Sequence, residues 1–346
     1  MAGNNINLGR CILAPMAGIT GFPFRKVALK CGAEFCFTEM VSATGFLHND
    51  KGTAELFYAG NDVMQTGIQL FGSSPEILAQ AAEKAADKGF KVIDINMGCP
   101  VKKVIKIGAG SAILKDLQTL SAIVKSVRPA LKDSFLTIKI RSGFDENSIN
   151  FLETGRIAEE SGVDAVFFHP RTRSLMFGGA ADHSLTKKLK ENISIPVYAS
   201  GDIFSAGDAL RIKHYTGADG IMFARGAIGR PWIFSEYLSA GYNNIFAESL
   251  KKGNSLAESA AAVLSGIERD IGHKINIMIE LAEEMCLFYG KERGCNLMKP
   301  HLYNFLKGSK GSKNLRVMVN NAKTGKEIKD ILNMFKTLND EYIGIN

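Results

Sequence analysis

Residues 195–226 have the sequence IPVYASGDIFSAGDALRIKHYTGADGIMFARG, in which one helical segment separates two short apolar runs. The runs IPVYASGD (195–202) and GIMFARG (220–226) contain the β-branched and aromatic residues that are typical of strands. The segment between them, SAGDALRIKHYTG (205–217), has the period of a helix and ends in Gly217, which suits a helix C-cap. The order strand, helix, strand predicts one βα unit of a parallel sheet.

The same alternation extends from residue 11 to about residue 225. Helical patterns cover residues 75–89 and 152–162, and each of them also ends in a Gly. The strand candidates are residues 11–16, 35–40, 67–72, 91–99, 135–141, 165–171, 195–202 and 220–226. Eight strands in about 230 residues fit an α/β TIM barrel better than an open doubly wound sheet. We therefore predict a TIM (β/α)8 barrel.

After Trp232 the alternation stops, and the remaining sequence has only helical patterns. Apolar residues recur at helical spacing in Met278, Leu281, Ala282 and Met285, and again in Ile328, Ile331, Leu332 and Phe335. We predict a catalytic barrel domain over residues 1–240 and an all-helical domain over residues 241–346. Residues 291–336 hold eleven Lys or Arg and three Asp or Glu, whereas the whole chain has a net charge of +7. A polyanionic partner for the helical domain is therefore plausible.

The composition is that of an ordinary globular protein. Apolar residues make up 46% of the 346 residues and charged residues 22%, and the mean hydropathy is +0.01. No uninterrupted run of about 18 apolar residues and no signal-peptide pattern is present, so we expect a cytoplasmic protein without membrane contact. The six cysteines form no CxxC pair, so we expect free thiols and no metal site. Nothing in the sequence indicates an obligate protein partner.

The carboxyl ends of barrel strands carry the chemistry of this fold, so the polar residues there are the candidate site. At those ends stand Pro15, Met16, Ala17, Gln69, Asn96, Cys99, Lys139, His169 and Arg171. Apolar residues would have been enough to fill the barrel. Amide, thiol, ammonium and imidazole groups at one mouth instead indicate a polar, planar ligand such as a flavin or a pyrimidine.

The last two strands each run into a glycine-containing turn, SGDIFSAGDA and ARGAIGRP. Loops after strands seven and eight are the usual phosphate site of this fold. Ser200, Gly201, Asp202, Ala224 and Arg225 are therefore candidates for binding a phosphorylated cofactor. The alternative is that the glycines only make tight turns. No Walker A motif and no GxGxxG after a strand is present, so the sequence supports neither a P-loop nor a Rossmann site.

Cys99 has two interpretations. A lone cysteine near an apolar strand is usually a small buried hydrophobic residue. Cys99, however, follows a strand within NMGCPVKK, beside three lysines, where a thiol could act as a general acid. His169 and Lys139 taken singly would be a structural histidine and a surface lysine, but together at one mouth they favour a ligand site.

In this order the motifs resemble one family, the tRNA-dihydrouridine synthases, and most closely its bacterial B-type subfamily. The matching segments are PMAGITGFPFR (15–25), IQLFG (68–72), DINMGCPVKKV (94–104), GAGSAILKD (108–116), TIKIRSGFD (137–145), HPRTR (169–173), SGDI (200–203) and ARGAIGRPW (224–232). The segment KERGCNLMKPHLYNFLKG (291–308) is similar to the helical domain of the family. Two positions depart from the family pattern: Ser200 stands where Asn is usual, and Pro170 where Gly is common.

The resemblance implies an FMN enzyme that uses NADPH to reduce the C5=C6 bond of selected uridines in tRNA. It implies that Pro15, Met16 and Ala17 lie along the flavin, that Gln69 and Lys139 bind its pyrimidine side, and that residues 200–202 and 224–225 hold its phosphate. It further implies that Asn96, Lys139, His169 and Arg171 bind the substrate, with His169 also touching the flavin and Cys99 donating the proton. The target base would have to be flipped out of its stack.

Two alternatives come from other classes of protein. One is an FMN barrel that acts on free pyrimidines, such as a dihydropyrimidine or dihydroorotate dehydrogenase, which has no use for a basic helical tail. The other is a non-catalytic RNA-binding protein, which has no need of Cys99, Lys139 and His169. A flavin spectrum would exclude the second of these.

Overall fold

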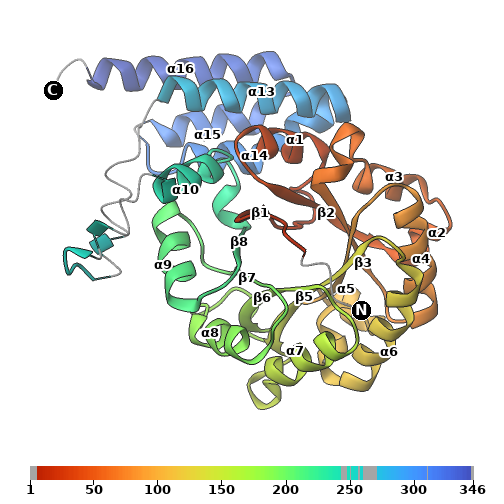
Figure 1. The fold of residues 1–346 in the computed structure, drawn as a ribbon. Coiled ribbons are helices and arrows are strands. Elements are labelled where there is room, and N and C mark those ends of the chain that lie inside the picture. Colours follow the sequence, from red (N-terminus) through yellow and green to blue (C-terminus); the bar gives the residue numbers. More distant parts are fainter. Residues whose placement is uncertain are drawn as a thin grey trace.

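The computed structural model describes residues 6–242, 248–249, 251–255, 258–259, 271–309 and 311–343. Eight strands form a closed barrel in the order β1 to β8, and every neighbouring pair is parallel (Figure 1). The strands are β1 (Cys11–Leu13), β2 (Phe35–Ser42), β3 (Thr66–Phe71), β4 (Val92–Met97), β5 (Phe135–Gly143), β6 (Ala165–Thr172), β7 (Val197–Ser200) and β8 (Gly220–Phe223). The predicted TIM barrel is confirmed.

Several strands end earlier than the apolar runs suggested. β1 ends at Leu13, although the backbone N–H of Ala14 still donates to the carbonyl of Phe223 at 2.8 Å. Pro15 follows and has no N–H to continue the ladder. β7 ends at Ser200 because Gly201 turns the chain with a φ of +108°. Pro15, Met16, Ala17, Gly201 and Asp202 therefore lie in the loops that follow these two strands.

Helices surround the barrel, and some of them begin at side-chain caps. Ser74 accepts a hydrogen bond from the N–H of Ile77, and Ser205 from that of Asp208, as N-caps do. The helices of the barrel are α1 (Phe22–Lys30), α2 (Ala43–Leu47), α3 (Lys51–Phe57), α4 (Pro75–Asp87), α5 (Lys102–Lys106), α6 (Leu117–Ala130), α7 (Phe151–Glu160), α8 (His183–Asn192), α9 (Ala206–Thr216) and α10 (Ile233–Tyr242). Short 3-10 turns span η1 (Gly60–Gln65), η2 (Gly110–Lys115), η3 (Glu146–Ser148) and η4 (Arg225–Ala227). The three helices predicted from the sequence are confirmed as α4, α7 and α9.

Aromatic rings fill the lower part of the barrel, where the strands begin. Phe37, Phe167 and Tyr198 pack ring against ring there, with centroids 5.0 Å apart in each successive pair. Glycines make room for them, because a Cβ on Gly67 would lie 2.5 Å from the Phe37 ring and one on Gly220 2.6 Å from the Tyr198 ring. The interior is therefore packed at the end opposite the polar residues.

The C-terminal region is helical, as predicted, and lies beside α1 and α10 (Figure 1). Its helices are α13 (Ile271–Tyr289), α14 (Lys291–Phe305), α15 (Ser312–Asn321) and α16 (Gly325–Ile343). One apolar cluster joins Leu13 and Phe24 of the barrel to Met278, Leu302 and Phe335 of these helices. The helical region is thus part of the same core. The domain boundary at residue 240 stays a prediction, and α10 runs past it to Tyr242. Within the described ranges, no helix has the length and hydropathy needed to span a membrane.

Candidate active site

A cavity of about 360 Å³ opens at the carboxyl ends of the strands. It brings together all but one of the predicted site residues: Pro15, Met16, Ala17, Gln69, Asn96, Cys99, Lys139, His169, Ser200, Gly201, Asp202, Ala224 and Arg225 line it. The missing one is Arg171. Because closure of the barrel points all strand ends to one mouth, residues from seven strands or from the loops that follow them meet there.

A chain of buried hydrogen bonds runs from β4 to the loop of Cys99. The Gln69 amide donates from Nε2 to the Asp94 carboxylate at 2.7 Å, and its Oε1 accepts from Nδ2 of Asn96 at 2.8 Å. Oδ1 of Asn96 in turn accepts from the backbone N–H of Cys99 at 2.8 Å. We call Asp94, Gln69 and Asn96 the amide chain. The carboxylate at one end and the backbone donor at the other fix the orientation of both amides.

The Cys99 loop is also braced from behind. Its carbonyl accepts hydrogen bonds from Oγ of Ser111 at 2.9 Å and from the N–H of Ser111 at 3.1 Å. Gly110 lets the two segments approach this closely, because a Cβ there would lie 2.9 Å from the Cys99 carbonyl oxygen. Burial raises the pKa of the half-buried Cys99 thiol, although the charges of Arg141 and Lys139 oppose the shift. The thiol therefore stays protonated at neutral pH.

Lys139 and Asp94 lie on neighbouring strands, and burial shifts their pKa values in opposite directions. Burial raises the pKa of Asp94 to about 7, against hydrogen bonds from Gln69 and Thr137 and the charge of Lys139. Burial and the nearby Arg141 lower the pKa of Lys139 to about 8. Nζ of Lys139 has no hydrogen-bond acceptor among the described residues. An ammonium group at the cavity wall with no hydrogen-bond acceptor among the described residues is suited to an anionic or carbonyl-bearing ligand.

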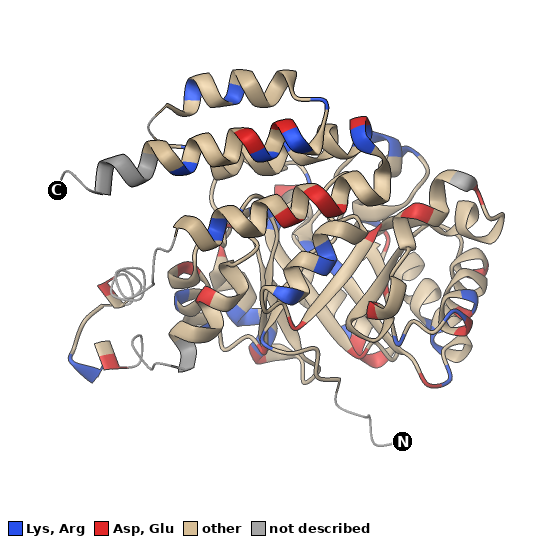
Figure 2. Ribbon diagram, turned by 90° about the horizontal axis from the view of Figure 1, so that it is seen from above, with Lys and Arg blue, Asp and Glu red and all other residues tan. Residues whose placement is uncertain are grey.

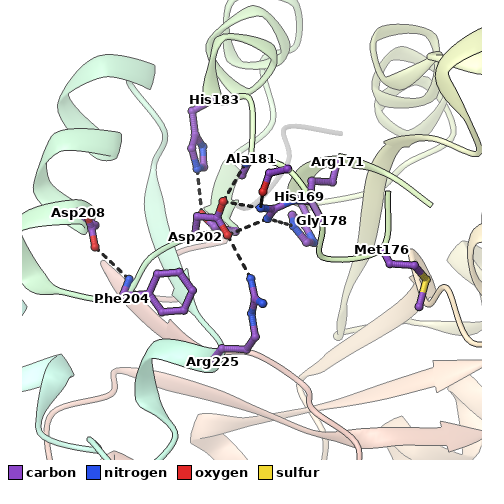
Figure 3. Close-up of polar contacts among 12 residues, drawn as sticks. His169, Arg171, Met176, Gly178, Ala181, His183, Asp202, Phe204, Asp208 and Arg225 are labelled. Atoms are coloured by element: carbon purple, nitrogen blue, oxygen red, sulfur yellow. Dashed lines mark hydrogen bonds and ion pairs between the residues drawn. The ribbon is translucent and has the colours of Figure 1, made fainter. Parts of the chain in front are cut away.

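His169 lies in the cavity as a neutral imidazole. Burial, together with the positive charges of Lys139 and of the neighbouring arginines, lowers its pKa well below the ordinary value. Its Nε2 is 3.3 Å from a guanidinium nitrogen of Arg171 (Figure 3). A neutral ring beside an arginine accepts a proton poorly, so His169 is a better hydrogen-bonding partner than a general acid.

Arg171 lies behind the cavity wall rather than in it. Its guanidinium donates to both carboxylate oxygens of Asp202, at 2.8 and 2.5 Å, and to the carbonyls of Gly178 and Gly179 (Figure 3). Burial alone would raise the pKa of Asp202, but these bonds and the N–H of Ala181 lower it. The guanidinium donates its hydrogen bonds to groups of this chain, and in doing so it holds the loop after β6 against the loop after β7.

The loops after β7 and β8 form a cradle of backbone N–H groups. In the described part of the chain, the N–H groups of Asp202 and Gly226 have no acceptor. A Cβ on Gly201 would lie 2.6 Å from the His169 ring, and one on Gly226 would lie 2.2 Å from the carbonyl oxygen of Ile203. Only glycine fits at either position. Such converging donors are typical of a phosphate site.

Arg225 stands at the edge of this cradle. Its guanidinium is 3.1 Å from Asp202 and lies against the rings of Phe177 and Phe204, 4.7 and 5.3 Å from their centroids. The side chain is held in place yet 40% exposed, so it can meet an anion that enters the mouth.

The sequence assigned no role to two buried residues that organise the site. Asp94 anchors the amide chain, and its signal was a single carboxylate within the apolar run VIDINM. Arg141 donates to the carbonyls of Gly98, Thr172 and Met176 at 2.9 Å each, and it joins the loops after β4 and β6. It stands two residues after Lys139 on the same face of β5, so its position at a strand end was the only signal.

Residues 12–340 match the family model described as Dihydrouridine synthase (Dus). The tRNA-dihydrouridine synthase B of Pasteurella multocida (strain Pm70) is 39% identical over 304 residues, which cover 86% of this chain and 84% of that protein. The protein of the same name from Vibrio cholerae is 34% identical over 322 residues, which cover 93% and 94%. A solved structure of 6-hydroxypseudooxynicotine amine oxidase from Pseudomonas geniculata N1 is similar in fold alone, with a TM-score of 0.50 and 14% identity over 72% of this chain and 52% of that one. The chain belongs to the dihydrouridine synthase family, and its resemblance to the B-type members is confirmed.

Proposed function

We propose that the protein is a tRNA-dihydrouridine synthase that binds FMN, takes electrons from NADPH and reduces the C5=C6 bond of selected uridines. One observation carries the proposal. A protonated thiol, an ammonium group with no hydrogen-bond acceptor among the described residues and a cradle of backbone donors line the same cavity. The names of the relatives support the choice of tRNA over free pyrimidines.

The residues of the cavity fit a flavin phosphate and ring. The glycine cradle and Arg225 would hold the phosphate, since the N–H groups of Asp202 and Gly226 have no acceptor within the described residues and the exposed guanidinium stands at the edge of the cradle. Gln69 uses one amide hydrogen and one lone pair within the amide chain, which leaves one of each for the ring edge. When bound, the flavin supplies the hydride that reduces the uracil.

Cys99 donates the proton that completes the reduction. Its raised pKa keeps the thiol protonated, and Asn96 and Ser111 fix its loop from both sides. His169 is the alternative donor, but its lowered pKa makes it neutral at working pH. General acid catalysis requires the proton to be present before it is transferred, which favours the thiol.

Asn96, Lys139 and His169 bind the uracil in this proposal, while Arg171 has a different part. Asn96 keeps one amide hydrogen free of the amide chain, and that hydrogen can meet a uracil carbonyl. Arg171 was expected to bind substrate, but its contacts with Asp202 make it a positioning residue for His169 and the cradle. We place the reaction in the cytoplasm because tRNA is found there.

Two half-reactions, followed separately by flavin absorbance without oxygen, test the function. NADPH should bleach the flavin of the purified protein, and tRNA transcribed without modifications should restore the colour. Mass spectrometry of that tRNA should find uridines that have gained two hydrogen atoms. Restoration by free uracil or orotate, but not by tRNA, would favour the dehydrogenase alternative. A colourless protein that binds tRNA would favour the binding module.

A further inference from the structure

A second cavity, of about 640 Å³, lies beside the mouth of the first. The two cavities share Phe204, Arg225 and Gly226, so they are contiguous. Its other walls come from the start of α10, from α13 and from the end of α14, which brings barrel and helical residues together. The volume lies within the range of about 300–1,000 Å³ that small-molecule sites occupy.

The charge of this cavity is positive. Arg225, Arg230, Lys274 and Lys307 line it, against the single carboxylate of Glu236. That carboxylate is already engaged, because Arg230 and Lys274 approach its two oxygens at 3.1 and 3.3 Å. Lys307 is exposed, and its ammonium has no acceptor within the described ranges. The cavity can therefore take a ligand with more than one negative charge.

The lining is also held in place and partly aromatic. The backbone of Phe204 is fixed at both polar groups, since its N–H donates to Asp208 at 3.2 Å and its carbonyl accepts from Arg230 at 3.1 Å. Its ring is 45% exposed and faces both cavities. A fixed ring beside guanidinium groups suits a planar base that carries phosphates.

We propose that the second cavity binds the phosphate-bearing adenosine end of NADPH while the nicotinamide end lies in the first. The inference rests on the proposed use of NADPH. A reductant that meets the flavin in the first cavity must place its pyrophosphate and 2′-phosphate outside it. Phe204, Arg225 and Gly226, which line both cavities, connect the first cavity to the excess of positive charge in the second. The bounded volume favours a dinucleotide over an RNA backbone, which would cross open surface.

Binding of 2′,5′-adenosine bisphosphate to the holoenzyme tests the site directly, by calorimetry and without turnover. We expect Lys307→Ala and Lys274→Gln each to raise the Kd of this probe roughly tenfold, since each removes a charged hydrogen-bond donor. The Kd of NADPH in the bleaching reaction should rise in parallel, with the limiting rate unchanged. The rate of bleaching by dithionite should stay the same. Lys326→Ala is the matched control, because Lys326 is exposed on α16 and does not line the cavity.

Three results would overturn the proposal. The first is a holoenzyme that does not bind the probe. The second is an unchanged Kd of the probe and of NADPH in both variants. The third is weaker binding of tRNA with unchanged binding of NADPH, which would assign the cavity to the RNA. A parent protein that NADPH cannot bleach, but that still binds the probe, would instead count against the proposed function.

Discussion

Replacement of Asn96 by Asp tests whether the amide chain sets the geometry of the site. The substitution changes one NH2 group into an oxygen at nearly constant volume. Oδ1 still accepts from the N–H of Cys99, but the new oxygen then faces Oε1 of Gln69 at a contact that is now 2.8 Å. While Asp94 is ionised, Gln69 does not turn its amide over, because its Nε2 donates to the Asp94 carboxylate, whose pKa burial raises to about 7. Two acceptors would therefore meet without a proton between them.

The cost follows from the burial of that contact. Gln69 is 1% exposed and Asn96 7%, so water cannot replace the lost donor. A buried polar group left without its partner costs about 1–3 kcal/mol. At about 2.1 cal/mol/K of unfolding entropy per residue, that loss corresponds to roughly 1–4 °C in Tm for a chain of 346 residues. The rate of flavin reoxidation by tRNA should fall as well, since Asn96 fixes the loop of Cys99.

The pH dependence distinguishes this mechanism from a general loss of packing. Protonation of the new carboxyl group restores a donor toward Gln69, so the pKa of this group in the folded state lies above its value in the unfolded chain. The folded state then binds the proton more tightly, and the deficit in unfolding free energy should shrink as the pH falls through the folded pKa. Urea unfolding of Asn96→Asp and of the parent between pH 4 and about pH 8 measures the difference.

A deficit that stays constant with pH, or no deficit at all, would refute the reasoning. Asn333→Asp is the control for the added charge, because Asn333 is exposed on α16. It should leave both Tm and reoxidation by tRNA unchanged.

Four further outcomes are expected. Cys99→Ala should slow reoxidation by tRNA about 10²- to 10⁴-fold and leave bleaching by NADPH unchanged; reoxidation as fast as in the parent would make the thiol a packing residue. Arg225→Ala should leave the fold intact but raise the Kd of FMN roughly tenfold, measured by flavin fluorescence, and an unchanged Kd would count against the cradle. Lys139→Met should stabilise the flavin-free protein most below pH 8. Because the pKa of Lys139 is lowered, the parent protein becomes more stable as the pH rises from about 8 toward the ordinary value of 10.5. The stability that Lys139→Met gains over the parent should therefore shrink across that range. Urea midpoints of the two proteins that differ equally at all pH values would contradict this. Affinity for tRNA should fall steeply with salt, by about 0.7–0.9 log units per log unit of salt for each phosphate neutralised; a flat dependence in filter binding would exclude phosphate contacts.

The barrel could be predicted because each of its units carries a complete local signal. In residues 195–226, for example, two apolar runs, a helical period and Gly217 all indicate the same structure, and Gly217 does adopt the left-handed conformation, with a φ of +67°. The short helices α2, α3 and α5 were not predicted. Each has seven residues or fewer, which is too short for a helical period, and their packing stabilises them more than their sequence does.

The candidate site could be predicted only as a set of positions. Strand ends meet at one mouth in any TIM barrel, so Gln69, Cys99, Lys139 and His169 follow from the fold alone. The sequence does not say which polar side chain bonds to which. Arg171 on β6 and Asp202 in the loop after β7 are 31 residues apart, and only the closed barrel shows that they pair. For that reason Arg171 was expected in the cavity but lies behind it.

The positive charge of residues 291–336 is also partly paired in the structure. Counting from residue 291 to 336 leaves out the carboxylates of other elements that pair with these cations. Lys329 pairs with Glu283 of α13 at 3.6 Å, and Arg293 pairs with Glu55 of the barrel at 2.7 Å. Figure 2 shows Asp and Glu as well as Lys and Arg on the helices of this region. Because paired cations release fewer counterions, the helical region should neutralise fewer phosphates than its sequence charge suggests. The cations near the barrel mouth, with Lys307 among them, therefore matter more for an anionic ligand than the total charge of the tail.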